Sequence, residues 1–154
     1  MLVIKEAITQ DLLEKTREIF KEYSNSLNID LSFQNFDEEL KSLPGYYAPP
    51  EGSILLAFYN EKLVGCVGLR KYQFEVCEMK RLYVRPKYRK MKIGSELCNA
   101  IILKAKQIGY KIMRLDTLPF MSEAISLYFK LGFKEIEPYR FNPIDNSKFY
   151  ELKL

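Results

Sequence analysis

The sequence predicts an α/β (α+β) fold, with a mixed, mostly antiparallel central sheet of six or seven strands flanked by about four helices. Three observations support this fold class. Apolar segments follow one another in pairs across short turns, which predicts antiparallel hairpins. Longer segments repeat apolar residues at helical spacing. One such helix joins two strand-like segments that no hairpin connects, which predicts a single parallel crossover.

The N-terminal part of the chain is expected to form one strand and then two helices. Residues 2–8 alternate in polarity and predict the strand. Thr9 is expected to cap a helix that reaches about residue 27, because apolar side chains recur there every three or four residues. A short second helix is predicted for residues 36–43. Three prolines and two glycines predict a loop over residues 43–53.

The middle of the chain is expected to form three consecutive strands and the crossover helix. Residues 54–60 and 63–72 flank a group of turn residues and predict a hairpin. A tight turn near residues 72–73 would lead into the next strand, residues 74–84. Residues 93–108 then predict an amphipathic helix, which the following glycine closes.

The C-terminal part is expected to contain one strand, one helix and a closing strand pair. The strand is predicted for residues 111–117 and the helix for residues 120–133. Residues 133–139 and 148–154 predict two strands around a loop rich in Pro and Asn. No repeat, low-complexity segment or linker interrupts the 154 residues, so one domain is expected over residues 1–154.

The composition disfavours several classes of function. The chain has 24 Lys and Arg residues against 20 Asp and Glu residues, and its net charge of +4 is modest for a nucleic-acid-binding protein. It has no His, which excludes Ser-His and Cys-His nucleophilic pairs and most zinc sites, so no metal is expected. An enzyme of this composition must use Glu, Asp, Tyr, Lys or Cys for proton transfer.

The cysteines and the apolar segments indicate a cytoplasmic protein. Cys66, Cys77 and Cys98 are odd in number and lie in apolar segments, so they are expected to be buried free thiols in a reducing compartment. No run approaches the roughly 18 apolar residues of a membrane span. The N-terminus has no secretory signal, and no membrane partner is expected.

The basic stretch YVRPKYRKMKIGSELC, residues 83–98, carries the strongest functional signal. By itself it is compatible with a nucleic-acid patch, a solvated helix start or a site for a phosphate-bearing cofactor. Its position favours the cofactor site, because it lies between the end of the strand 74–84 and the start of the helix 93–108. Open α/β sheets bind ligands at the carboxyl ends of their strands, and free backbone amides at a helix start favour an anion.

Two motifs resemble signatures of the GNAT N-acetyltransferase superfamily. The segment RLYVRPKYRKMKIGSEL resembles its cofactor-binding motif, in which a Leu-Tyr-Val-x-Pro phrase is followed by Arg/Gln-x-x-Gly-x-Gly/Ala at a helix start. Arg89 and Gly94 match that pattern. The segment EAISLYFKLGF resembles the second signature, Ala-x-x-Leu-Tyr-x-x-x-Gly-Phe. The order of the predicted elements agrees with the family over essentially the whole chain. The matching residues of the second signature are Ala124, Leu127, Tyr128, Gly132 and Phe133.

The resemblance implies that acetyl-CoA is the cosubstrate. The pantetheine arm of the cofactor would pair like an extra strand with the backbone of Leu82, Tyr83 and Val84. The helix start would bind the pyrophosphate through its backbone amides, with added charge from Arg and Lys side chains. The residues implied at the pyrophosphate are Arg89, Lys90, Met91, Lys92, Ile93, Gly94 and Ser95.

The chain departs from the family pattern at three positions. Lys90 and Lys92 stand where family members usually have Gly, and Met121 stands where they often have Asn. Gly lets the backbone approach a phosphate closely and tolerates a positive φ. If Lys90 and Lys92 adopt a positive φ, the loop is expected to be strained.

The resemblance also implies catalytic residues. Tyr128 occupies the general-acid position, and its alternative role is that of a packed core aromatic. Glu78 occupies the place of the general base in some members, and strand alternation is expected to put it on one face with Lys80 and Leu82 unless a bulge intervenes. Its alternative role is a cross-strand ion pair with Lys80 or Arg81. Asp116 is a lesser candidate, for which a structural hydrogen bond is favoured.

The resemblance predicts an N-acetyltransferase that moves an acetyl group from acetyl-CoA to a primary amine by direct attack in a ternary complex. The acceptor would be a small molecule, an amino acid or a peptide, and specificity would come from residues 25–36, 43–52 and 138–149. Arg140 is hypothesised to pair with an acceptor carboxylate. The alternatives are a non-catalytic acyl-CoA-binding sensor and, more remotely, a nucleic-acid-binding module. Homodimerisation is common in the family, but the sequence identifies no interface.

Overall fold

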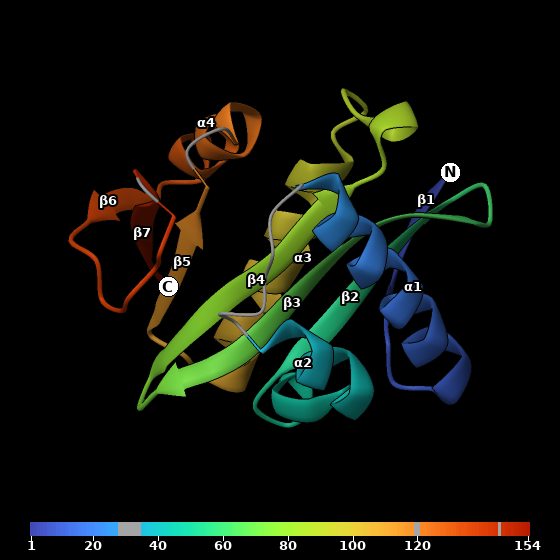
Figure 1. Cartoon of the computed structure of the whole chain (residues 1–154), viewed down its shortest axis with the longest axis horizontal. Coiled ribbons are helices and arrows are strands. Elements are labelled where there is room, and N and C mark those ends of the chain that lie inside the picture. Colours follow the sequence, from blue (N-terminus) through green and yellow to red (C-terminus); the bar gives the residue numbers. More distant parts are fainter. Residues whose placement is uncertain (28–34, 119–120, 145) are drawn as a thin grey trace.

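The fold is a mixed sheet with helices on both faces (Figure 1). The structure is a computed structural model that describes residues 1–27, 35–118, 121–144 and 146–154. Within these residues, seven strands form one sheet in the order β1-β2-β3-β4-β5-β7-β6, and four α-helices accompany it. The β4–β5 pair is parallel and every other pair is antiparallel, which confirms the predicted fold class. The elements are β1 (Leu2–Glu6), α1 (Gln10–Ser26), α2 (Phe36–Ser42), β2 (Ser53–Tyr59), β3 (Lys62–Gln73), β4 (Val76–Val84), α3 (Ile93–Ile108), β5 (Ile112–Thr117), α4 (Ser122–Lys130), β6 (Lys134–Ile136) and β7 (Lys148–Lys153).

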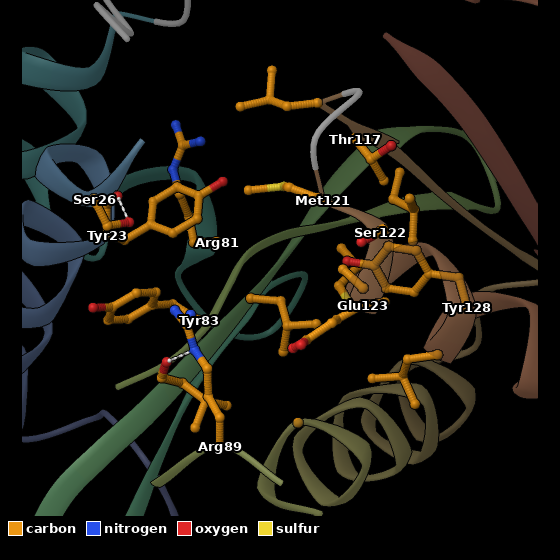
Figure 2. A pocket seen from close by; sticks show the side chains of 18 of the residues that line it. Tyr23, Ser26, Arg81, Tyr83, Arg89, Thr117, Met121, Ser122, Glu123 and Tyr128 are labelled. Carbon is orange, nitrogen blue, oxygen red and sulfur yellow. Dashed lines mark hydrogen bonds between the residues drawn. The ribbon is translucent and has the colours of Figure 1, made fainter. Parts of the chain in front are cut away.

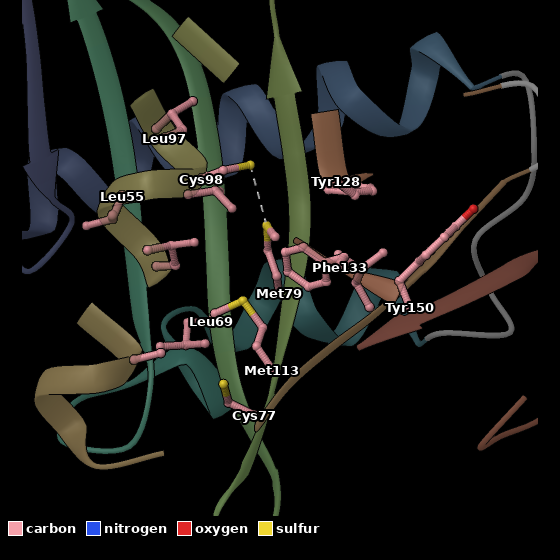
Figure 3. Packing of buried hydrophobic residues seen from close by; sticks show 14 of the residues in the cluster. Leu55, Leu69, Cys77, Met79, Leu97, Cys98, Met113, Tyr128, Phe133 and Tyr150 are labelled. Atoms are coloured by element: carbon pink, nitrogen blue, oxygen red, sulfur yellow. Dashed lines mark hydrogen bonds between the residues drawn. The ribbon is translucent and has the colours of Figure 1, made fainter. Parts of the chain in front are cut away.

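Two apolar clusters cover the two faces of the sheet. On one face, Ile19 and Phe20 of α1 and Leu40 of α2 pack on the sheet. On the other face, Leu97 of α3 and Tyr128 of α4 belong to a cluster that also contains residues from β2, β3, β4, β5 and β7 (Figure 3). Across the described residues, none of the helices has the length and apolarity needed to cross a bilayer.

The three cysteines are buried free thiols, as the sequence predicts. The Sγ atom of Cys98 lies 3.9 Å from the Sδ atom of Met79 within the apolar cluster (Figure 3). Burial raises the pKa of the Cys77 and Cys98 thiols to about 12. These thiols therefore stay protonated at neutral pH and are not nucleophiles.

The helix and strand boundaries mostly follow the predictions. Thr9 caps α1 by accepting a hydrogen bond from the backbone amide of Leu12 at 3.3 Å. The turn predicted near residues 72–73 is wrong, because β3 continues to Gln73 and the turn lies at residues 74–75. Glu75 in this turn has a φ of 62°, and Phe74 is exposed. Phe74 therefore belongs to the turn, although its apolar side chain predicted that it begins the next strand. The predicted loop 43–53 contains a short 3₁₀ turn, Gly45–Tyr47.

A β-bulge interrupts the pairing of β3 with β4. Cys66 pairs with Tyr83, while Gly68 pairs with Lys80, so β4 contains one more residue than β3 between these pairs. Arg81, the extra residue, has a φ of 61°. The bulge reverses the alternation of the strand, and Leu82 packs with the cluster on the α3 face. The expectation that Glu78, Lys80 and Leu82 share one face applied to a strand without a bulge, and the bulge places Leu82 on the opposite face.

A buried ion pair holds the bulge. The Nε and Nη2 atoms of Arg81 donate to the two carboxylate oxygens of Glu39 in α2, both at 2.9 Å. The two side chains are 3% and 2% exposed. Burial alone would raise the pKa of Glu39, but the hydrogen bonds and charge of Arg81 outweigh it and lower that pKa. The pair therefore ties α2 to the distorted residue of β4.

The two parallel strands separate just before the bulge. β4 and β5 pair at three positions, from Val76–Ile112 to Glu78–Arg114. Past Glu78 the strands diverge (Figure 1). The part of β4 from Met79 to Val84 therefore has one backbone edge that faces no neighbouring strand of the described sheet.

We predict that Arg81→Met lowers the free energy of unfolding by about 3–5 kcal/mol, because it leaves the Glu39 carboxylate buried without its partner. Denaturant unfolding at pH 7 measures the change. Lys41→Met is the control, because its pair with Glu38 spans 3.9 Å on the surface and its loss should change stability by less than about 0.5 kcal/mol. A loss below about 1 kcal/mol for Arg81→Met would contradict the role of the pair.

Candidate active site

A cavity of about 800 Å³ opens where β4 and β5 separate (Figure 2). The C-terminal end of α1, the end of β4, the start of α3, the end of β5 and the start of α4 line it. Most residues predicted for cofactor binding or catalysis meet there, although Met91 and Glu78 do not line this cavity. The predicted residues that line it are Leu82, Tyr83, Val84, Arg89, Lys90, Lys92, Ile93, Gly94, Ser95 and Tyr128.

The start of α3 offers free backbone donors to the cavity. The first backbone hydrogen bond of the helix runs from the amide of Glu96 to the carbonyl of Lys92 at 3.0 Å. The amides of residues 93–95 therefore have no acceptor within the helix, and no described side chain caps it. These amides and the helix dipole make this end of the cavity suited to an anion such as a pyrophosphate.

The loop before α3 has a strained backbone, because Lys90 and Lys92 both adopt the positive φ considered in the sequence analysis. Lys90 has a φ of 66° and Lys92 a φ of 63°. Such left-handed angles are unfavourable for a residue with a Cβ atom and are the reason that Gly is common in phosphate loops. Met91, between the two lysines, is 43% exposed and lies outside the cavity lining. The loop thus presents two cations to the cavity at the expense of backbone strain.

The end of β4 and the side chain of Arg89 form one wall of the cavity. The Nε atom of Arg89 donates to the carbonyl oxygen of Val84 at 2.9 Å (Figure 2). Its guanidinium carbon also lies 5.8 Å from the ring centroid of Tyr83. Arg89 is therefore held against the end of the strand, between the unpaired edge of β4 and the start of α3.

Tyr128 of α4 lies on the opposite wall of the cavity from Tyr83 (Figure 2). The side chain is 6% exposed, and its ring centroid lies 5.6 Å from that of Phe133. Its hydroxyl forms no hydrogen bond with any described residue, yet it is not sealed from solvent. Burial raises the pKa of Tyr128 well above 10, so the hydroxyl stays protonated and is available as a donor.

Glu78 lies in a buried ion network beside the cavity. Its carboxylate is 0% exposed, accepts a hydrogen bond from the Tyr139 hydroxyl at 2.6 Å, and lies 3.0 Å from the Nε atom of Arg70. Arg140 donates to Glu78 at 3.3 Å and to Asp116 at 2.9 Å. The cross-strand partner of Glu78 is thus Arg70, and not the two residues proposed from the sequence. Arg140 is already held between two carboxylates.

A set of polar residues at the end of the cavity away from the start of α3 was not identified from the sequence. Tyr23 of α1, Lys80 of β4 and Asn142, in the loop before β7, line the cavity. The Asn142 side-chain amide donates to Asp116 at 3.1 Å. The available signal was the presence of three charged residues, Glu78, Lys80 and Arg81, within the otherwise apolar strand β4, because charged side chains are rarely buried without a partner. Residues 28–34, part of a predicted specificity segment, lie outside the described residues.

The sequence matches a known enzyme family. The profile of the Acetyltransferase (GNAT) family matches residues 9–133. An uncharacterized N-acetyltransferase of Schizosaccharomyces pombe is 40% identical over 149 residues, covering 96% of this chain and 91% of the relative. An uncharacterized N-acetyltransferase of Dictyostelium discoideum is 34% identical, covering 99% of this chain and all of the relative.

Solved structures of acetyltransferases have the same fold. A GNAT-family acetyltransferase of Staphylococcus aureus superposes with a TM-score of 0.82 at 25% identity, covering 99% of both chains. A GNAT-family acetyltransferase of Elizabethkingia anophelis with acetyl-CoA bound superposes with a TM-score of 0.67 at 26% identity, covering 99% of this chain and 98% of that one.

We predict that Lys92→Gly raises the free energy of unfolding by about 1 kcal/mol, because Gly adopts the left-handed angle of this position without strain. Thermal or denaturant unfolding of the ligand-free protein measures the change. Lys92→Ala is the matched control, since it removes the same charge but keeps a Cβ atom. If the Gly variant were no more stable than the Ala variant, the backbone at Lys92 would not be strained.

Proposed function

The chain belongs to the Acetyltransferase (GNAT) family, and from this membership we propose that it transfers an acetyl group from acetyl-CoA to a primary amine. The acceptor is a small molecule, an amino acid or a peptide, and the amine attacks directly in a ternary complex. One observation carries the proposal. A single cavity joins the uncapped start of α3, the unpaired edge of β4 and the free hydroxyl of Tyr128.

The residues of one half of the cavity fit coenzyme A. The pyrophosphate is an anion, and the backbone amides of residues 93–95 together with Lys90 and Lys92 offer donors and positive charge. The edge of β4 offers backbone groups that a pantetheine amide can pair with, as a neighbouring strand would. The acetyl-CoA carried by the Elizabethkingia anophelis relative supports this assignment.

Tyr128 supplies the proton that the leaving sulfur needs. Bound acetyl-CoA contributes an activated acetyl thioester, and a departing thiolate has a basicity near that of Cys, with a pKa of ~8.5. A hydroxyl that remains protonated and has no competing partner is suited to donate to this sulfur. Because a thiolate of this pKa leaves readily, the donor should accelerate the reaction without being indispensable.

Glu78 is better suited to positioning than to proton transfer. As a general base it would have to reach the acceptor amine, but three side chains already share its fully buried carboxylate: Arg70, Tyr139 and Arg140. We therefore assign it the role of holding Arg140 and Tyr139 beside the cavity. The cavity is open to water, which can carry the proton away from the amine.

The proposed function predicts both binding and turnover. Acetyl-CoA at 100 times its Kd should raise the free energy of unfolding by about 2.7 kcal/mol, which a thermal-shift assay detects. Release of free coenzyme A thiol in the presence of a panel of primary amines tests transfer. Binding without release for any amine would instead indicate an acyl-CoA sensor. No binding of coenzyme A, together with salt-dependent binding of DNA or RNA, would indicate a nucleic-acid-binding module.

We predict that Tyr128→Phe lowers kcat by about 10–100-fold because the leaving sulfur loses its proton donor. The dissociation constant of coenzyme A should change less than about threefold, since the aromatic ring stays in place. Tyr150→Phe is the matched control, because its ring centroid lies 6.3 Å from that of Tyr128 and its hydroxyl is buried outside the cavity lining. Unchanged turnover in Tyr128→Phe would remove the assignment.

A further inference from the structure

Lys80 is a buried cation that faces the cavity and has no ion-pair or hydrogen-bond partner in the described part of the chain. It lies on β4 beside the bulge, lines the cavity and is 8% exposed. No described residue forms an ion pair or a hydrogen bond with its ammonium group. The nitrogen is not among the sealed side-chain atoms that lack a partner, so it retains contact with open space. Because the residue lines the cavity, that space is the cavity itself.

The carboxylates around Lys80 are already paired. Glu39 of α2 is held by Arg81 through two hydrogen bonds. Asp116 of β5 is held by Arg140 and by the side-chain amide of Asn142. These carboxylates are bound by other residues, and Lys80 forms no ion pair with any of them among the described residues.

Among the described residues, the charges around Lys80 contain one more cation than anions. Besides Glu39 and Asp116, the remaining acid is Glu78, which pairs with Arg70 and Arg140. Within the described part of the network, three carboxylates thus face three guanidinium groups and the Lys80 ammonium. Burial lowers the pKa of Lys80 to about 8; the charges of Arg81 and Arg140 add to this effect, and those of Glu78 and Asp116 oppose it in part. A buried charge of this kind is unfavourable until an anion joins it.

We propose that Lys80 binds a carboxylate of the acceptor, so that the acceptor is an amine that also carries a carboxylate: an amino acid or the C-terminal residue of a short peptide. This inference rests on the proposed function and names the substrate class of the same site. A carboxylate supplies one negative charge, which matches the excess of one cation. Tyr23, whose phenol also lines this end of the cavity, adds a polar neighbour.

The coenzyme A phosphates are less suitable partners for Lys80. Val84 lies four positions after Lys80 in β4, and an extended strand rises about 3.3 Å per residue, so Lys80 lies up to about 13 Å from the end of the strand. The anion-binding amides of α3 lie beyond that end. Arg140, which the sequence suggests for the acceptor carboxylate, is occupied by Glu78 and Asp116. Lys80 takes over that role.

The first measurement compares amino acids with their amides as acceptors. For each pair, kcat/KM is determined in the wild type, Lys80→Met and Lys80→Arg, and the acid-to-amide ratio is compared between proteins so that intrinsic amine reactivity cancels. Lys80→Met should lower this ratio about 10–100-fold through KM, because a charge-assisted hydrogen bond is lost. Lys80→Arg should recover part of it. Lys87→Met, an exposed lysine outside the cavity lining, should leave it unchanged.

The second measurement does not depend on turnover. Calorimetric titration of the coenzyme A complex with an N-acetyl amino acid and with its amide measures the product affinities directly. The wild type should prefer the acid, and Lys80→Met should not. The preference should weaken as the pH rises above about 8, because Lys80 loses its proton there.

The outcomes separate this inference from the proposed function. If amines are acetylated but the acid-to-amide ratio is the same in the wild type and in Lys80→Met, the carboxylate assignment is overturned while the function stands. An equal loss of kcat for acids and amides would overturn it in favour of Lys80 as a proton acceptor. If no amine is acetylated, the function fails, and the calorimetric preference alone decides the assignment of Lys80.

Discussion

The buried ion pair between Glu39 and Arg81 is the interaction on which the site depends. A bulge places one extra residue in β4, and its left-handed backbone is unfavourable for Arg. Two hydrogen bonds to α2 hold that residue where it is. In the described sheet β4 pairs with β5 at three positions, the last at Glu78, and the bulge follows in the part of β4 that has left β5. The separation of these strands creates the cavity.

The cavity has two ends of different chemistry because different elements meet at each. At one end, the start of α3 brings free amides and two lysines together, a combination suited to phosphate groups. At the other end, α1, the bulge of β4 and the loop before β7 bring together polar and charged side chains from distant parts of the sequence. The unpaired edge of β4 connects the two ends. A donor and an acceptor can therefore meet at the middle of one strand.

The two faces of the sheet differ in polarity near the cavity. The face under α3 and α4 is apolar, and burial there keeps the Cys77 and Cys98 thiols and the Tyr128 hydroxyl protonated by raising the pKa of each. The other face carries the ion network of Glu78, Asp116 and Arg140. Tyr128 reaches the cavity from the apolar side and Lys80 from the ionic side. In the proposed function, proton donation and acceptor recognition thus come from opposite faces of the sheet.

The sequence by itself determined the order of the elements, the helix start of α3, the burial of the cysteines and the family signatures, because these depend on local periodicity, on caps and on residues close together in the chain. It could not place the bulge, since one inserted residue leaves the apolar pattern of β4 intact while reversing the direction of Leu82. It could not assign Glu78, Lys80 or Arg140 either. Their roles depend on contacts between charged residues that lie about 60 positions apart in the sequence. Only the tertiary structure decides which of these residues pair.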